Sequence, residues 1–332
     1  MFKRSRFVAA ALLAISVWFF ATGFTVPDTV ERDRSLPSIE LNGYPFHAEA
    51  FGDPDHPVVI VLHGGPGADY RYLYSLKALA DDYLVVFYDQ RGTGLSPRVP
   101  AEEITLQVFV NDLDAFVEAF GKGRPVHLVG HSWGAMLASA YAGAHPHKVK
   151  KIVLAEPAFL DSTTLGDLDS GRWPGIRVMW GFTKAWVSKW FVRAHGDEYA
   201  RDDFFLLQVM PLMQGADELC DGKLPPLEAW RFGSPNFKAT LGRMMNDPEW
   251  AASLDFRKGV DAFRGETLFL VGECNKVVGA AHQKKHLGHF ANAKLEVVPA
   301  AGHFMFNDRP DYSNSVLRAF LADKTPSVTA AP

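Results

Sequence analysis

The stretch VHLVGHSWGAMLASAYA, residues 126–142, decides the fold of this chain. A short apolar-leaning run passes through Gly130, Ser132 and Gly134 and continues with small residues in a helical pattern. A Gly-x-Ser-x-Gly sequence where a strand turns into a helix is a nucleophile elbow, whose glycines keep side chains away so that the serine hydroxyl stands exposed. The N-terminus of the helix behind it favours developing negative charge. The motif therefore predicts a nucleophilic serine at position 132.

The strand-then-helix pattern recurs along the chain. Short apolar, β-branched runs predict buried strands, and they lie within residues 57–67, 83–94, 125–130, 151–156, 267–273 and 293–303. Helical patterns lie at residues 70–80, 105–120, 132–144, 277–290 and 311–321. Alternating strands and helices predict an α/β fold, a doubly wound and mostly parallel sheet with helices on both faces. Binding groups should then gather at the carboxyl ends of the strands.

Residues 157–264 interrupt this alternation. The segment is roughly helical and holds six of the eight tryptophans: Trp173, Trp180, Trp186, Trp190, Trp230 and Trp250. We interpret it as a helical cap inserted into a core of residues 38–156 and 265–323, with 324–332 as a flexible tail. A helical wheel of residues 176–192 predicts one apolar face, made of Ile176, Met179, Trp180, Trp186, Val187, Trp190 and Phe191. We expect this face to close over the active site as a lid, and the alternative is a helix lying in a membrane interface.

The N-terminus differs from the rest of the chain. Lys3, Arg4 and Arg6 precede residues 7–24, which carry no charge. As a helix, these residues would reach about 27 Å, close to the roughly 30 Å hydrocarbon core of a bilayer. The pattern predicts either a membrane anchor within residues 1–24 or a cleaved signal peptide, and both place the catalytic domain outside the cytoplasm. The polar, proline-punctuated residues 25–37 are interpreted as a linker.

Composition excludes several classes of protein. The chain has 332 residues and a formal net charge of −4, whereas nucleic-acid binding usually needs a strongly basic face. The two cysteines, Cys220 and Cys274, make neither a disulfide framework nor a zinc site; they either pair with each other or remain buried free thiols. His282, His286 and His289 have a spacing typical of metal ligands, but no carboxylate or thiolate completes the set. We expect a solvated helix face there and no metal.

Three further motifs accompany the serine elbow: HGGPG at residues 63–67, DQRGTGLS at 89–96 and AGHFMF at 301–306. With them, residues 38–321 resemble the α/β-hydrolase superfamily, and most of all its prolyl aminopeptidase-type branch, which carries the same kind of HGGPG and DQRG elements. That branch commonly has glycine where this chain has His131. The resemblance implies an α/β-hydrolase core and a reaction that requires no cofactor and no metal.

The resemblance also implies roles for individual residues. His303 lies in a glycine-bearing loop after the last strand, where the family places its general base, and the order of serine before histidine fits this fold. An oxyanion hole needs two backbone N–H groups, which we expect from Trp133, the residue after the nucleophile, and from Gly65. His131 is expected to serve in packing, and His63 to shape the oxyanion loop.

The carboxylate partner of the base has two candidates. The base needs a carboxylate to fix its tautomer and to stabilise the imidazolium. The family usually places an aspartate after its seventh strand, where this chain has the neutral Asn275. Glu156 ends the strand before the cap, a position where haloalkane dehalogenase-like relatives carry their acid, and Glu273 lies near Asn275. We expect Glu156 to be the acid and keep Glu273 as the alternative.

These residues predict a serine hydrolase that cleaves an ester or amide bond of a small, apolar substrate or short peptide through an acyl-enzyme. Prolyl aminopeptidase is the narrower alternative and would need cap carboxylates to hold a free amino group; the candidates are Glu198, Glu218, Glu228 and Glu249. Dehalogenase and epoxide hydrolase chemistry is disfavoured, because both resemble this fold but use an aspartate at the elbow. The alternative from a different functional class is a non-catalytic ligand-binding protein of the same fold. It is supported by the neutral Asn275, which stands where the family usually has its catalytic aspartate. The expected partners are the substrate and, through the N-terminal segment, a membrane; no nucleic acid is expected.

Overall fold

The computed structural model describes residues 23–168 and 176–322. Its described strands form one sheet in the order β1-β2-β4-β3-β5-β6-β7-β8, in which β1 and β2 are antiparallel and β3 to β8 are parallel. The strands are β1 Ser38–Leu41, β2 Tyr44–Phe51, β3 Val58–Leu62, β4 Leu84–Tyr88, β5 Val126–His131, β6 Val149–Ala155, β7 Glu266–Gly272 and β8 Asn292–Val298. The predicted α/β class with a mostly parallel sheet is confirmed. The antiparallel edge made by β1 and β2 was not predicted.

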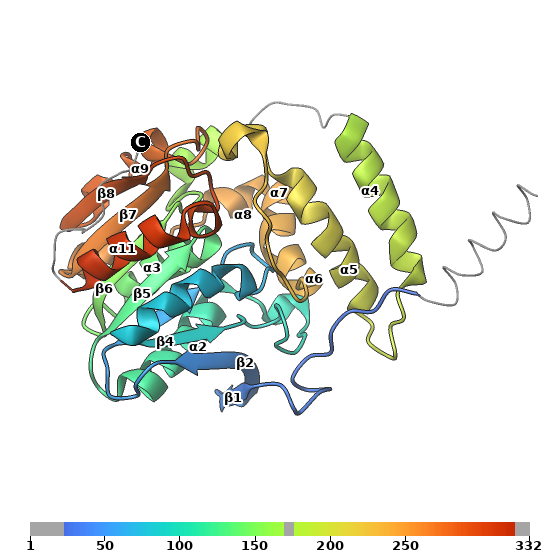
Figure 1. Ribbon diagram of the computed structural model, residues 1–332, viewed down its shortest axis with the longest axis horizontal. Helices are drawn as coiled ribbons and strands as arrows, with labels where there is room; N and C mark the ends of the chain where they lie inside the picture. Colours follow the sequence, from blue (N-terminus) through green and yellow to red (C-terminus); the bar gives the residue numbers. More distant parts are fainter. Residues whose placement is uncertain (1–22, 169–175, 323–332) are drawn as a thin grey trace, which may run out of the picture.

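Helices cover both faces of the sheet (Figure 1). On one face, α2 (Leu106–Gly121) and α3 (Trp133–Ala144) pack their apolar residues against the strands. On the other face lie the 3₁₀ helix η1 (Arg71–Asp81) and α11 (Pro310–Leu321). The central strands β3 and β4 are buried along their whole length, as expected of continuous β-branched runs in a parallel sheet.

The described residues between β6 and β7 add helices but no strand to the sheet. In Figure 1 they form the group of helices beside the sheet. The elements are η3 Ser162–Leu168, α4 Ile176–Ser188, η4 Lys189–Phe191, α5 Ala200–Val209, η5 Met210–Met213, η6 Ala216–Glu218, η7 Cys220–Gly222, α6 Ser234–Phe237, the π-helical η8 Lys238–Gly242, α7 Arg243–Asn246, α8 Pro248–Ala252 and η9 Val260–Ala262. We refer to residues 157–264 as the cap segment.

The apolar face predicted on α4 does not close over the active site. Ile176 is 83% exposed and Trp180 is 71% exposed, and Met179, Trp186, Val187 and Trp190 are exposed as well. The helix packs through Phe182 and Ala185 instead, against Leu206 and Val209 of α5. The lid interpretation of this face is therefore wrong: periodicity identified an apolar stripe, but a different side of the helix carries the packing.

The predicted linker is packed against the cap segment and the core. Directly before it, the Phe24 amide donates to the Phe191 carbonyl at 3.0 Å, and within it the Val30 amide donates to the Leu95 carbonyl at 2.9 Å. Val30 is buried, and Arg231 of the cap segment donates to the carbonyl of Pro27. Residues 25–37 thus carry contacts that join the two parts.

In the described part of the chain, no helix combines the length and the apolar character that crossing a membrane requires. This finding contradicts the predicted membrane anchoring and extracytoplasmic localisation. Residues 1–22, on which the prediction of an anchor or signal peptide rested, lie outside the described residues, as do Trp173 and the tail from residue 323.

The long helix predicted at residues 277–290 is also corrected. The segment forms two short pieces, α9 (Ala280–Gln283) and η10 (Leu287–His289). His282 and His286 are buried, so the expected solvated face is wrong. The His282 ring instead bonds the Asp167 carboxylate at 3.1 Å and the Ala158 carbonyl at 2.8 Å. Among the described residues, no cluster of histidine, cysteine and carboxylate side chains has a geometry that could hold a metal ion.

Candidate active site

Ser132 occupies the turn between β5 and α3 with φ 54° and ψ −119°, a left-handed conformation that a non-glycine residue rarely adopts. The two glycines of the motif permit this turn. A Cβ atom on Gly130 would lie 2.3 Å from the Gly134 carbonyl oxygen, and one on Gly134 would lie 2.0 Å from the Leu62 carbonyl oxygen. The close approach of α3 to β3 and β5 thus excludes side chains at both positions, and it sets the serine at the carboxyl edge of the sheet.

His303 and Glu156 lie side by side, although 147 residues separate them. The Glu156 carboxylate is fully buried directly after β6, and its Oε2 accepts a hydrogen bond from His303 Nδ1 at 2.7 Å. The same oxygen accepts from Asn275 Nδ2 at 2.7 Å, and Oε1 accepts from the Gly272 amide at 2.8 Å. Because the ionised carboxylate can only accept, His303 carries its proton on Nδ1, and Nε2 is left to accept a proton.

Burial and pairing act in opposite directions on the pKa of His303. Burial lowers the pKa, but the hydrogen bond and the negative charge of Glu156 outweigh it, so the pKa of His303 lies above its ordinary value of 6.5. Burial raises the pKa of Glu156 above its ordinary value, and the bonds from His303, Gly272 and Asn275 oppose this shift. The pair is thus suited to holding an extra proton on the imidazole.

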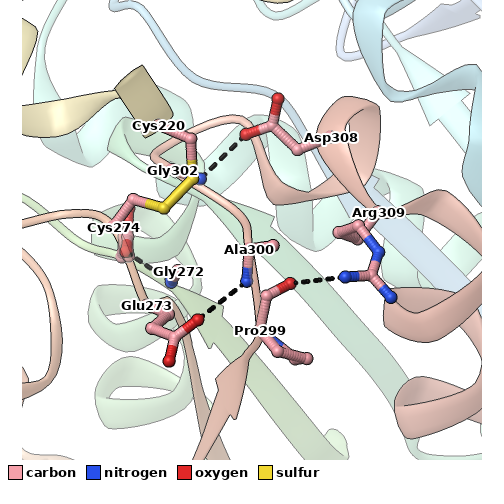
Figure 2. The surroundings of a disulfide bond; sticks show 10 residues. Cys220, Gly272, Glu273, Cys274, Pro299, Ala300, Gly302, Asp308 and Arg309 are labelled. Carbon is pink, nitrogen blue, oxygen red and sulfur yellow. Dashed lines mark hydrogen bonds between the residues drawn. A yellow bond between two sulfur atoms is a disulfide. The ribbon is translucent and has the colours of Figure 1, made fainter. Parts of the chain in front are cut away.

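The alternative acid, Glu273, is directed away from this pair. Its side chain is exposed, and its carboxylate accepts from the Ala300 amide at 2.9 Å (Figure 2). Asn275 is buried, and its Oδ1 accepts from the amides of Val277 and Val278 at 2.9 and 3.0 Å. These bonds fix the amide group so that its nitrogen faces Glu156. The structure therefore brings Glu156, and not Glu273, to His303.

The two expected oxyanion donors line the same cavity as Ser132. Gly65 is exposed in the loop after β3, and Trp133 is the first residue of α3. The neighbouring Gly64 amide already donates to the Tyr72 hydroxyl at 2.7 Å, so it is not available as the second donor. The Trp133 indole donates to Gln90 Oε1 at 3.0 Å, so the DQRG loop supports the residue after the serine.

His131 does more than pack. The Tyr72 hydroxyl, which accepts from Gly64, donates in turn to His131 Nδ1 at 2.8 Å. His131 Nε2 then donates to the main-chain carbonyl of His303 at 2.8 Å. Burial lowers the pKa of His131 well below its ordinary value, which keeps the ring neutral, as this chain of bonds requires. The His63 ring bonds the Gly64 carbonyl at 2.9 Å, so it contacts the loop that was expected to supply an oxyanion donor.

A disulfide ties the cap segment to the loops of the site (Figure 2). Cys220 and Cys274 are bonded, with 5.1 Å between their Cα atoms, so the alternative of two free thiols is wrong. The Cys274 amide donates to the Ala301 carbonyl at 2.9 Å, and the His303 amide donates to the Glu218 carbonyl of the cap segment at 2.8 Å. The cap segment therefore contacts the main chain of His303 directly.

Two cavities meet at Ser132, and Gly65 lines both. The smaller cavity, of about 140 Å³, extends past Trp133 between the core and the cap segment; its lining includes Leu106, Met136, Phe159, Ala239, Met244 and Leu254. The larger cavity, of about 350 Å³, extends past His303; its lining includes Asp69, Leu207, Met210, Gln214, Glu228 and Ala229. Both are closed on one side by the cap segment, so the site lies between it and the carboxyl edge of the sheet.

The cap carboxylates considered for an amine site differ in position. Glu228 lines the larger cavity, where it pairs with Arg71 at 2.9 Å. The Glu218 carboxylate is turned to the Gly215 amide at 3.1 Å. Glu198 and Glu249 line neither cavity.

A model of the alpha/beta hydrolase fold matches residues 57–310. Proline iminopeptidase of Heyndrickxia coagulans is 41% identical over 120 residues, which make up 34% of this chain and 39% of that protein. Epoxide hydrolase 3 of Xenopus tropicalis is 25% identical over 299 residues, 85% of this chain and 76% of that protein. The crystal structure of VinJ has a TM-score of 0.61 at 23% identity and covers 87% of this chain and 98% of its own. These matches confirm the resemblance drawn from the motifs, and the proline iminopeptidase match spans about two fifths of that relative.

Proposed function

This chain belongs to the alpha/beta hydrolase fold family, and we propose that it is a serine hydrolase that cleaves an ester or amide bond through an acyl-enzyme. The observation that carries the proposal is the arrangement around Ser132. Ser132, in a strained turn, lines the same cavity as His303. The Nδ1 atom of His303 is hydrogen-bonded to the buried carboxylate of Glu156. Such a set of nucleophile, base and orienting acid is what activation of a hydroxyl group requires.

In the first half of the proposed reaction, Ser132 Oγ attacks the substrate carbonyl carbon while its proton passes to His303 Nε2. Glu156 stabilises the imidazolium that forms. The amides of Gly65 and Trp133 hold the negative oxygen of the tetrahedral intermediate. The bond to the leaving group then breaks, and the leaving group takes the proton from His303.

In the second half, water replaces the leaving group. His303 removes a proton from a water molecule while the oxygen of that water attacks the acyl carbon. The bond to Ser132 breaks, and the serine oxygen recovers the proton from His303. The acid product leaves, and the enzyme returns to its starting state without any cofactor.

A prolyl aminopeptidase is the second candidate function. It is favoured by the match to proline iminopeptidase, which covers a third of this chain, and Glu228 in the larger cavity is a carboxylate beside the site. The match to an epoxide hydrolase extends over more of the chain, but this chain has serine at the elbow, whereas the epoxide hydrolases that share this fold use an aspartate there.

The test compares wild type with Ser132→Ala. We expect a fluorophosphonate probe to label the wild type and not the variant, and hydrolysis of p-nitrophenyl esters to fall by about 10⁴-fold or more in the variant. Thermal unfolding of both proteins checks that the variant is folded. Near wild-type turnover by Ser132→Ala would refute the serine mechanism, and absence of labelling and of hydrolysis in the wild type would favour a non-catalytic binding protein.

A further inference from the structure

We infer that the two cavities divide the substrate at its scissile bond: the smaller one takes an uncharged, apolar acyl group of about six to eight carbons, and the larger one takes the leaving group. The inference rests on the proposed acyl transfer at Ser132 and adds to it the identity of the acyl group. It assigns Ala239 and Met244 as residues that determine acyl length.

The position of His303 gives the direction of the substrate. The leaving group must receive a proton from His303 Nε2, so it has to lie on the His303 side of the serine. His303 and His131 line the larger cavity, whereas Trp133 and Met136 line the smaller one. The acyl group, which stays bonded to the serine when the leaving group departs, is therefore left with the smaller cavity.

The lining of the smaller cavity specifies an apolar occupant. Among the described residues that line it, none carries a charge. Its two threonine hydroxyls are already used locally, because Thr105 accepts from the Val108 amide and Thr240 donates to the Asn236 carbonyl. A free ammonium group on the acyl part would find no carboxylate among these lining residues, and burying its charge without one would be costly.

The volume of the smaller cavity limits the size of the acyl group. At about 140 Å³ it is close to the roughly 150 Å³ apolar cavity that accommodates benzene in an engineered protein. Six to eight carbons in a chain or a ring fill such a space, and longer chains do not fit. Each methylene buried in it should raise kcat/KM about fourfold, until the cavity is full.

This assignment bears on the aminopeptidase candidate. An enzyme that removes N-terminal proline holds the prolyl residue as its acyl group, together with the charged imino group. In this chain the carboxylates Asp69 and Glu228 line the other cavity, on the leaving-group side. The inference therefore predicts that aminoacyl substrates are poor and that neutral acyl groups are good.

The experiment measures kcat/KM for p-nitrophenyl esters from acetate to laurate, which share one leaving group, and for proline p-nitroanilide. We expect a maximum at six to eight carbons, at least a tenfold fall at twelve carbons, and little hydrolysis of the proline substrate. Ala239→Phe should move the maximum to four carbons or fewer, and Met244→Ala should move it to longer chains. Two variants with opposite expected shifts keep the test informative if one of them fails to fold.

Ala229→Phe is the matched control, because the same substitution is then made in the larger cavity. It should leave the acyl-length profile unchanged and should reduce hydrolysis of hexanoate esters of bulky alcohols relative to methyl hexanoate. The inference is overturned if Ala229→Phe shifts the acyl-length profile while Ala239→Phe and Met244→Ala do not. It is also overturned if proline p-nitroanilide is the best substrate. In both cases, labelling of Ser132 by the fluorophosphonate would still support the serine mechanism. Failure of that labelling would refute both proposals.

Discussion

Replacing Glu156 with glutamine should nearly abolish activity. In the structure, three N–H donors converge on its two carboxylate oxygens: His303 Nδ1 and Asn275 Nδ2 on one, and the Gly272 amide on the other. A glutamine side chain offers one acceptor oxygen and one NH₂ group. If the oxygen faces His303, the NH₂ group faces the Gly272 amide; if it faces Gly272, the NH₂ group faces His303 and Asn275. Each orientation leaves buried donors without an acceptor.

The consequence for catalysis follows from the tautomer. When the NH₂ group faces His303, Nδ1 must become the acceptor, and the proton moves to Nε2, which then cannot take the proton of the serine. The other orientation retains the tautomer but removes the charge that stabilises the imidazolium. We expect kcat to fall by about 10³- to 10⁴-fold and the protein to lose about 1–3 kcal/mol of stability for each donor left unpaired.

The assay is kcat and kcat/KM on a p-nitrophenyl ester, with thermal unfolding measured in parallel to separate catalysis from folding. Glu273→Gln is the matched control. Its exposed carboxylate bonds the Ala300 amide, a bond that an amide oxygen also makes, so activity should stay within about twofold. Asn275→Ala should cost less activity than Glu156→Gln, because the carboxylate charge remains. If Glu273→Gln inactivates and Glu156→Gln does not, the assignment of the acid is wrong.

Three further predictions concern the pH profile, the disulfide and the elbow. Because the raised pKa of His303 lies above 6.5 and the base must be neutral to work, kcat/KM should fall as the pH drops through a value above 6.5; an acid limb below 6.5 would contradict the raised pKa. Replacing both Cys220 and Cys274 with serine removes a cross-link between residues 54 positions apart and should lower the free energy of unfolding by up to about 4 kcal/mol in denaturant titrations, whereas an unchanged midpoint would show that the link adds no stability. Gly134→Ala should prevent folding or cost at least about 3 kcal/mol, because its Cβ would meet a backbone oxygen at 2.0 Å, whereas Gly166→Ala, with open space around it, should stay within about 0.5 kcal/mol; equal stability of the two variants would refute the close-packing argument.

The sequence predicted those parts of the molecule that depend on local pattern. The central strands β3 and β4 are continuous apolar runs, and Ser132 is marked in the sequence by the two glycines that the close approach of α3 requires. Its placement between a strand and a helix is as expected. The choice of Glu156 over Glu273 followed from the resemblance to haloalkane dehalogenase-like relatives, and the geometry agrees with it, although the roles of these residues stay predictions.

The features that the sequence did not predict depend on tertiary contacts. Tyr72 bonds His131 across 59 positions of the chain, and no local motif marks such a pair. The edge strand β1 alternates exposed and half-buried residues, which is a weak signal for a strand. On α4, the wheel placed Trp180 and Trp186 on one apolar face, but periodicity does not say which side of an amphipathic helix meets the protein.

The position of Glu156 has a consequence for how this enzyme can be diversified. Ser132 and Glu156 both belong to one contiguous β5–α3–β6 unit, which ends where the cap segment begins. A gene recombination that exchanged the cap segment would therefore leave the proposed nucleophile and acid in place as a block, together with His303, which lies in the core after β8. The contact that the new segment would have to restore is the hydrogen bond from the His303 amide to the Glu218 carbonyl. The disulfide is the restriction on such an exchange, because an incoming segment without a counterpart of Cys220 would leave Cys274 as a free thiol beside Asn275. Substrate range can then change by replacement of one module, under one covalent constraint.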